Sequence, residues 1–450
     1  MPNQSEMKKA VRHLDTTRRM KELLPGFFGR SSEEEENRQV AWCMVGVPPE
    51  LLKAFDVEWE WPENFGTLCA SRMVALNFIE EAESEGYSPE ICSYVNNTLG
   101  FCKRCLETGG SPPELDQVRG MRKPSFLLGS GVTCEPRYKW FQAVATRYFQ
   151  VPVHSSDPLS PPWDADLNDP RVEKHYVEQL RRDLQGQVAF LEEQTGKKLE
   201  KDRLRNIMKL SQEALWYWYQ VLQMRRAVPA PMGSTDYFIA IIPQMYMLGE
   251  KEAVDFYREM FHEVRKRVEL GEGVVDEENY RLIFFGLPPW YNLGMFNYLE
   301  SQGAVVVYES VYNVGEWREL ELNDPLEALV QRTWKKAYRA WQRGAETMPE
   351  TCELSAVGNF TGSNLLEELA REFKLDGAIC HQTRSCRALS FGHVHTRNRL
   401  AELGIPSLIF ESDMADPRHW SDAQVKTRLH AFLEVAGREK SRRLRKGGVE

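Results

Sequence analysis

Residues 376–392 read Asp-Gly-Ala-Ile-Cys-His-Gln-Thr-Arg-Ser-Cys-Arg-Ala-Leu-Ser-Phe-Gly, and this stretch decides the expected fold. The apolar run 378–380 is typical of a buried parallel strand. A polar segment follows, and it carries His381, Arg384, Ser385, Cys386 and Arg387. Loops that leave the carboxyl ends of strands bind ligands in open α/β sheets. We therefore expect an α/β fold with functional side chains in this loop.

The alternation of strands and helices recurs along the chain and predicts two doubly wound parallel-sheet domains of the Rossmann or flavodoxin-like kind. A length of 450 residues also favours more than one core. An N-terminal helical leader and a helical insertion complete the predicted architecture. The expected limits are 1–38 for the helical leader, 39–165 for the first α/β domain, 166–270 for the helical subdomain, 271–437 for the second α/β domain and 438–450 for a basic tail.

Composition argues against several classes of protein. The formal net charge is −9 and we find no zinc-finger or RNP motif, so a nucleic-acid partner is not expected. The longest apolar run, 237–248, contains Pro243 and is too short to span a bilayer. Residues 1–30 lack the apolar core of a signal peptide. Nine cysteines without a secretory signal favour the reducing cytoplasm, where thiols stay free or bind metal.

Three cysteines lie at or just after the ends of predicted strands: Cys92, Cys134 and Cys386. The charges of Arg384 and Arg387 would bias Cys386 towards the thiolate, the form that binds metal or attacks an electrophile. The long separations exclude a compact ferredoxin-type run, so a shared metal site would form only in the folded chain. Three unrelated buried thiols are the alternative.

Other motifs are interpreted as structural or absent. Cys102 and Cys105 form a C-x-x-C motif without a second one, which favours a helical turn with two incidental cysteines. No G-x-x-x-x-G-K-[ST] motif occurs, so the chain is not expected to hydrolyse ATP. His393 and His395 are spaced i, i+2, do not share a helical face, and are expected at the surface.

Several of these stretches together resemble one known family. The motifs are residues 47–52, 62–64, 92–95, 131–134, 376–392 and 404–413. They are similar to the signatures of the 2-hydroxyacyl-CoA dehydratase and ATP-dependent benzoyl-CoA reductase family, and the resemblance spans residues 40–435. Residues 280–326, including Gly-Leu-Pro-Pro-Trp at 286–290, look most like the larger active-site subunit of benzoyl-CoA reductase.

The resemblance implies a [4Fe-4S] cluster held by Cys92, Cys134 and Cys386. It also implies a paralogous catalytic subunit and a separate ATP-hydrolysing iron–sulfur activator as partners. The expected reaction is reduction of benzoyl-CoA, or a substituted relative, to a cyclic dienoyl-CoA by low-potential single-electron steps. One alternative is a 2-hydroxyacyl-CoA dehydratase subunit that eliminates water by a ketyl-radical mechanism. Another is a non-catalytic scaffold or cluster-delivery partner of the same fold.

Residues beside the implied ligands are the remaining site candidates. His381, Ser385 and Tyr94 flank the cysteines and are expected to move protons, position the substrate or hydrogen-bond to cluster sulfur. An acyl-CoA pocket is expected between the two α/β domains, with Trp290 as a flat apolar wall. The expected substrate-binding residues are Trp290, Arg384, Arg387, Glu63 and Asn64.

Overall fold

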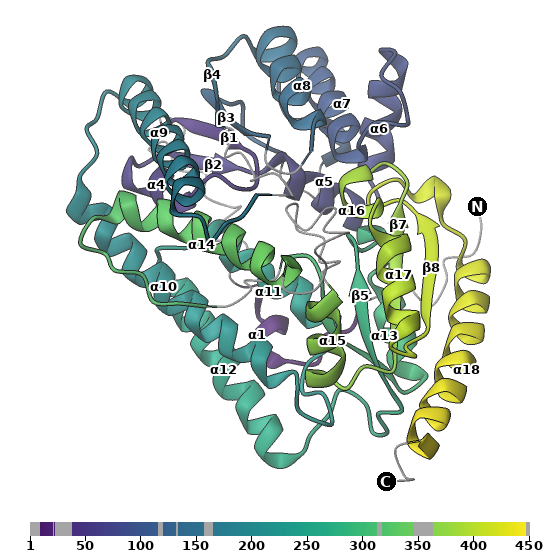
Figure 1. Ribbon diagram of the computed structural model, residues 1–450. Helices are drawn as coiled ribbons and strands as arrows, with labels where there is room; N and C mark the ends of the chain where they lie inside the picture. The colour runs from purple at the N-terminus through teal and green to yellow at the C-terminus, as the bar shows by residue number, and fades with distance from the viewer. Residues whose placement is uncertain are drawn as a thin grey trace.

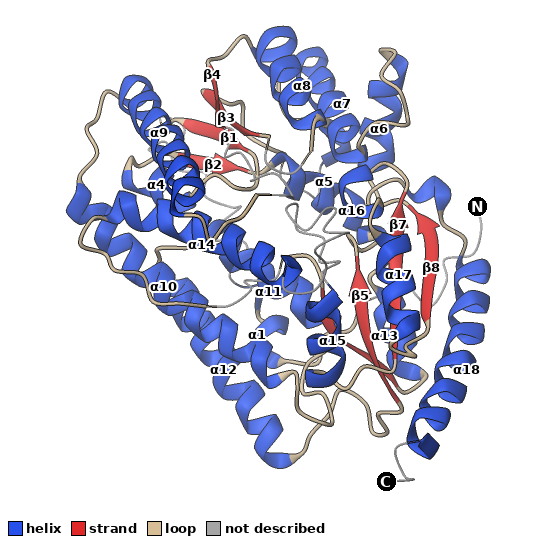
Figure 2. Cartoon of the chain, viewed as in Figure 1, coloured by secondary structure: helices blue, strands red, loops and turns tan. Residues whose placement is uncertain are grey.

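Two four-stranded parallel sheets form the framework of the chain (Figure 1, Figure 2). The structure is a computed structural model, and it describes residues 10–20, 22, 38–115, 120–131, 134–156, 165–312, 317–345 and 363–446. The predicted α/β class with two parallel sheets is confirmed. Of the predicted leader, the described part contains the short helix α1 (Asp15–Arg18), and the rest of it lies outside the described residues.

The first sheet has the strand order β2-β1-β3-β4, and every strand of it runs parallel to its neighbours. Its central strands β1 and β3 are buried along their whole length, as their apolar sequences predict. We call this sheet with its helices the N-terminal unit. Its elements are β1 (Val40–Cys43), α4 (Pro49–Ala54), β2 (Glu58–Glu60), α5 (Pro62–Ser71), α6 (Ala75–Ser84), α7 (Ser93–Thr108), a 3-10 turn (Pro113–Leu115), β3 (Phe126–Ser130), α8 (Pro136–Ala143), a π-helix (Val144–Phe149) and β4 (Val153–Ser156).

The second sheet has the order β6-β5-β7-β8 and is also entirely parallel. Strand β5 is covered on both faces: Leu282 and Phe284 pack into the main core, while Ile283 and Phe285 pack into a second core under α15 and α17. We call this sheet with its helices the C-terminal unit. Its elements are β5 (Tyr280–Phe285), α13 (Gly294–Ser301), β6 (Ala304–Glu309), α15 (Ser363–Glu372), β7 (Gly377–Thr383), α16 (Arg387–Ser390), α17 (His393–Glu402), β8 (Ser407–Ser412) and α18 (Asp422–Lys446).

Long helices lie beside the two sheets (Figure 1), and four of them, α9 to α12, fall within residues 166–270. Helix α10 packs on α12, and α14 packs on α9. Gly196, with φ of 68°, takes the left-handed conformation that ends α9 at low cost. No helix in the described ranges is both long and apolar enough to cross a membrane. The elements are α9 (Pro170–Thr195), α10 (Lys201–Met224), α11 (Ser234–Tyr246), α12 (Lys251–Leu270) and α14 (Pro325–Ala345).

The two sheets have the same strand order, that of flavodoxin-like folds. In each sheet the first and third strands of the unit are neighbours, and the chain leaves them in opposite directions. Ligand sites of α/β proteins form at the carboxyl ends of such strand pairs. Here these are the ends of β1 and β3 in one unit, and of β5 and β7 in the other.

Helices α5 and α6 are separate, because Met73 between them has a positive φ of 61°. Two predicted boundaries were wrong. Strand β7 continues to Thr383, so His381 belongs to the strand and not to the loop. The basic segment expected as a tail after the last helix is helical to Lys446, since two of its cations, Lys440 and Arg443, pair with buried Asp376.

Candidate active site

The three cysteines singled out in the sequence each stand at the start of a helix. Cys92 is the N-cap of α7, Cys134 comes just before α8, and Cys386 is the N-cap of α16. Each sulfur accepts backbone N–H bonds from the turn that follows: Cys92 from Tyr94 and Val95, Cys134 from Arg137, and Cys386 from Leu389. Such N–H donors favour the thiolate form of a cysteine.

The fold brings these three half-buried thiols together from both units. The Cys92 sulfur interacts electrostatically with those of Cys386 and Cys134, and Cys386 also interacts with Cys134. Burial raises the pKa of all three thiols, that of Cys386 to about 12, and their mutual repulsion adds to this for Cys92 and Cys386. Three thiols held together against this cost suit a positively charged metal group, which deprotonates them outright.

The expectation that two arginines make Cys386 a thiolate was wrong. Arg384 forms an ion pair with Glu411, and Arg387 forms one with Glu135. Both guanidinium charges are therefore paired with carboxylates and not with the Cys386 sulfur. Burial of the thiol dominates instead and raises its pKa. The Arg387 side chain is 74% exposed, so the packing does not support its predicted contact with substrate.

The donor set consists of thiolates, whose chemistry suits an iron–sulfur cluster. Among the described residues, no three His, Cys, Asp or Glu side chains are arranged to hold one metal ion. In a cluster each cysteine binds a different iron, so the sulfurs stand further apart than around one ion. Soft thiolates are the ligands that such clusters prefer. Clustered thiols with N–H donors at each sulfur therefore fit the group that the sequence motifs imply.

A buried cation, Arg137, stands beside the cysteines, and it was missed in the sequence. Its side chain is 4% exposed. Nη2 donates to Glu63 Oε1 at 2.6 Å, and Nη1 donates to the Val45 carbonyl at 3.0 Å. The Arg137 charge lowers the pKa of Cys134 against the effect of burial. Glu63, expected to bind substrate, is thus occupied by Arg137, and the neighbouring Asn64 is half-buried. The only sign of Arg137 in the sequence was its position, one helical turn after the candidate metal ligand Cys134.

Ser385 joins the two units directly beside the cysteines. Its hydroxyl donates to Asp413 Oδ2 at 2.5 Å and accepts from the Ser93 backbone N–H at 3.1 Å. Asp413 also accepts from the Ser385 backbone N–H at 3.1 Å. Because Ser93 follows Cys92 and Ser385 precedes Cys386, these bonds fix the spacing of two ligand loops. The geometry supports a positioning role for Ser385.

His381 lies inside the sheet, away from any opening. Its Nδ1 hydrogen-bonds to the Leu287 carbonyl and its Nε2 to the Ser412 hydroxyl at 2.6 Å. Its ring stacks on Phe410 with centroids 4.8 Å apart. Burial lowers the pKa of His381 to about 4, so the ring is neutral. Both nitrogens are occupied, which removes the support for acid–base catalysis. His393, expected at the surface, is also buried.

Tyr94 and Trp290 form the apolar part of the contact between the units. Trp290 Nε1 donates to the Tyr94 hydroxyl at 2.5 Å, and the Thr67 hydroxyl lies 3.2 Å from the same oxygen. The Trp290 ring packs edge-on against Phe238 and is 7% exposed. Trp290 therefore packs within the junction, and it does not line the pocket described next.

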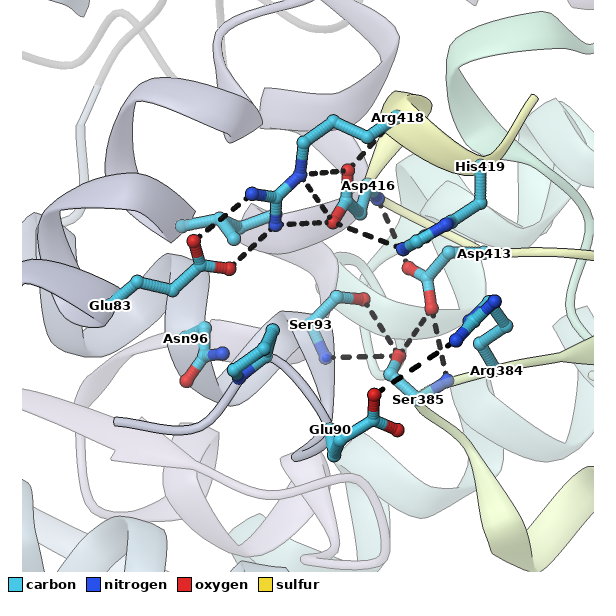
Figure 3. Close-up of a pocket in the computed structure, with 12 residues that line it drawn as sticks. Glu83, Glu90, Ser93, Asn96, Arg384, Ser385, Asp413, Asp416, Arg418 and His419 are labelled. Atoms are coloured by element: carbon cyan, nitrogen blue, oxygen red, sulfur yellow. Dashed lines mark hydrogen bonds and ion pairs between the residues drawn. The ribbon is translucent and has the colours of Figure 1, made fainter. Parts of the chain in front are cut away.

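A polar pocket of about 290 Å³ opens beside these loops, and Figure 3 shows its lining. Ser93 and Ser385 form its inner wall, and an ion pair between Glu83 and Arg418 spans one side. Arg384 lines it too, with Glu90 and Glu411 as its partners. Because the lining is largely charged, the pocket suits polar groups and water better than an aromatic ring.

Comparison with known proteins places residues 44–436 in the family described as 2-hydroxyglutaryl-CoA dehydratase, D-component. The chain belongs to this family. The family expected from the motifs is thereby confirmed. Within it, the chain is similar to dehydratase and reductase subunits at comparable levels of identity.

Three relatives show this range. The chain is 27% identical to the (R)-2-hydroxyisocaproyl-CoA dehydratase alpha subunit of Clostridioides difficile, over 92% of this chain and 94% of that protein. It is 26% identical to the (R)-phenyllactyl-CoA dehydratase alpha subunit of Clostridium sporogenes, over 96% and 98%. It is also 26% identical to a benzoyl-CoA reductase subunit of Thauera aromatica, over 94% and 95%.

Proposed function

We propose that this chain is a catalytic subunit that binds a [4Fe-4S] cluster and acts on an acyl-CoA through low-potential single-electron chemistry. The observation that carries the proposal is the meeting of Cys92, Cys134 and Cys386 at the junction of the two units. Each sulfur has N–H donors from the turn that follows it, and such bonds help to set cluster potential. The reducing cytoplasm is the proposed location.

The chain's own residues have distinct roles in this proposal. The three thiolates would hold the cluster, which supplies one-electron transfer when bound. Arg137 offsets part of the negative charge of the thiolates, and Ser385 with Asp413 fixes the loops of two ligands. Since the sequence has no P-loop, a separate ATP-hydrolysing activator is the proposed electron source. The relatives are named as subunits, which supports a paralogous catalytic subunit as partner.

Our first proposal for the reaction is reduction of benzoyl-CoA, or a substituted relative, to a cyclic dienoyl-CoA. It is supported by the motifs in residues 280–326 and by the similarity to the benzoyl-CoA reductase subunit of Thauera aromatica. Elimination of water from a 2-hydroxyacyl-CoA is the second proposal, and the two dehydratase alpha subunits support it. A product assay with partner and activator present separates them: net uptake of electrons identifies a reductase, and none identifies a dehydratase. A chain that carries the cluster but never changes an acyl-CoA would be a scaffold.

Iron analysis tests the cluster itself. Anaerobic purification is expected to give about four irons per chain. Replacement of Cys92, Cys134 or Cys386 by Ala is expected to remove most of this iron and its visible absorption. Replacement of Cys102 and Cys105, which lie together on α7, is the matched control and should leave iron content unchanged. Full iron retention in the triple Ala variant would refute the site.

A further inference from the structure

The ion pair between Arg137 and Glu63 stands at the carboxyl ends of β1 and β3. Arg137 Nη1 donates to the Val45 carbonyl just beyond β1 at 3.0 Å, and to the Ser130 carbonyl at the end of β3 at 3.4 Å. Arg137 Nη2 donates to Glu63 Oε1 at 2.6 Å, and Glu63 Oε2 accepts from the Val45 backbone N–H at 2.9 Å. Both side chains are thus fixed at the edge where α/β sheets bind ligands.

This pair lies between two of the candidate ligand loops. Cys134 precedes Arg137 by three residues and stands just before the same helix, α8. On the other side, Glu63 lies in the first turn of α5. The Thr67 hydroxyl, one turn further along α5, lies 3.2 Å from a tyrosine hydroxyl in the first turn of α7, the helix whose N-cap is Cys92. The charges of the pair therefore adjoin the loops of both cysteines of the N-terminal unit.

One nitrogen of the Arg137 guanidinium is left without an acceptor. Arg137 is 3% exposed, and its Nε is buried with no hydrogen-bond partner among the described residues. A buried donor without an acceptor costs free energy. Sulfur atoms of an iron–sulfur cluster accept hydrogen bonds, and such bonds are one of the factors that set cluster potential. A cation with a free N–H group therefore fits beside the sulfur-rich anion that the cysteines suit.

We propose that Arg137 raises the reduction potential of the cluster held by the three cysteines, and that Glu63 limits this effect. This inference rests on the proposed function, because it requires the cluster. Uptake of one electron adds one negative charge at the three thiolates and their metal group. A positive charge in a water-excluded site stabilises the added charge, and a negative charge opposes it. The balance of the pair thus decides how strong a reductant the partner protein must be.

Redox titration tests the opposite signs that this role requires. The full-length chain is purified anaerobically, its iron content is measured, and its reduced cluster is followed by electron paramagnetic resonance. We expect Arg137→Gln to move the midpoint to a more negative potential and Glu63→Gln to move it to a more positive one. The double variant should return towards wild type, and Arg137→Lys, which keeps the charge, should stay closer to wild type than Arg137→Gln.

Opposite shifts separate an effect of charge from a loosening of the packing, which would move both single variants in the same direction. Glu63→Gln keeps an oxygen that can accept the Val45 N–H. It therefore carries the test alone if Arg137→Gln loses its iron, and a shift to more negative potential would then overturn the proposal.

Arg387 and Glu135 form the matched control pair. They carry the same two charges beside Cys386 and Cys134, but their side chains are 74% and 70% exposed. Because water and salt screen exposed charges, Arg387→Gln and Glu135→Gln should shift the potential several-fold less than the buried variants.

Shifts of Arg137→Gln and Glu63→Gln in the same direction, no shift in either, or equal shifts in the exposed pair would overturn the role of Arg137 while leaving the cluster and the enzyme class intact. Absence of any reducible cluster in the wild-type chain, even after reconstitution with iron and sulfide, would overturn the proposed function and the role of Arg137 with it.

Discussion

His381 makes the stability of the protein depend on pH. Burial lowers its pKa from 6.5 to about 4. Between these two pH values the ring is therefore neutral in the folded chain and protonated in the unfolded chain. Stability is therefore lost as pH falls from 6.5 to 4, by about 3 kcal/mol for the full shift. We expect wild type to lose more unfolding free energy over this interval than His381→Gln, in urea titrations at several pH values. The pKa of His393 is also lowered by burial, so the double variant with His393→Gln should flatten the dependence further. Identical pH slopes in all three proteins would contradict this.

Arg137 is expected to stabilise the junction more than any exposed arginine. Replacing it by Gln leaves Glu63 beside three thiols without its buried partner, which typically costs about 3–5 kcal/mol. Denaturant unfolding of the iron-free chain measures this cost. Arg387→Gln removes an exposed ion pair with Glu135 and should cost less than about 1 kcal/mol. Similar losses in both variants would show that the Arg137 pair is not a buried one in solution.

Helices α6 and α7 meet closely because Gly100 has no side chain. A Cβ at this position would lie 1.8 Å from the Phe78 carbonyl oxygen, so the two helices would have to separate. Gly100→Ala is therefore expected to lower the thermal midpoint by several degrees and to disturb Cys92 at the start of α7. Gly110→Ala, where the added Cβ meets open space, should leave the midpoint nearly unchanged.

The end of helix α18 is held by a buried carboxylate. Lys440 and Arg443 donate to Asp376 at 2.8 and 3.2 Å, and Asp376 is almost completely buried. Replacing both cations by Met is expected to reduce the unfolding free energy by about 2–3 kcal/mol, because an unpaired buried carboxylate remains. Arg438→Met with Arg442→Met removes two exposed pairs of the same helix and should cost under about 1 kcal/mol.

Strands could be predicted from the sequence where their apolar residues form an uninterrupted run. Strand β5, residues 280–285, is such a case, because each of its residues from Arg281 onward is buried. Strand β7 was cut short at Cys380, since polar residues after an apolar run normally leave a strand; hydrogen bonds from β8 extend it. The same kind of long-range contact extends α18. Local sequence does not contain these partners.

The site could be predicted only in part, for a related reason. Cys92, Cys134 and Cys386 were joined by family resemblance, because their spacing alone could not distinguish a shared site from three separate thiols. Arg137 belonged to no recognised motif, and burial raised the pKa of Cys386 although two nearby arginines were expected to lower it. Side-chain burial and pairing arise from the tertiary fold, so the roles expected of His381 and Trp290 changed once their neighbours were known.

Across the whole molecule, opposite charges face each other at the mouth of the junction. The N-terminal unit presents Glu83, Glu90 and Glu135, and the C-terminal unit presents arginines that pair with them: Arg418, Arg384 and Arg387 respectively. These pairs are partly exposed and should weaken as salt rises.

We expect Arg418→Gln combined with Arg384→Gln to loosen the junction and to release iron to a chelator several-fold faster than wild type. High salt should bring the wild-type rate towards that of the variant. Arg399→Gln, which removes ion pairs with Glu367 and Glu402 inside the C-terminal unit, is the control and should leave the rate unchanged. A chelation rate that is the same in all three proteins and independent of salt would show that these charges do not restrain the opening.

The junction also determines when a cofactor could be acquired during biogenesis. One unit supplies Cys92 and Cys134 and the other supplies Cys386, so no nascent chain that ends before Cys386 holds the full set. Such an intermediate could offer two sulfurs at most. Maturation machinery would therefore have to load a cluster late in synthesis or after it, into a chain whose units have docked. Until then the two units lack this covalent tie, and quality-control proteases would meet a protein less stable than the loaded form by the free energy of cofactor binding.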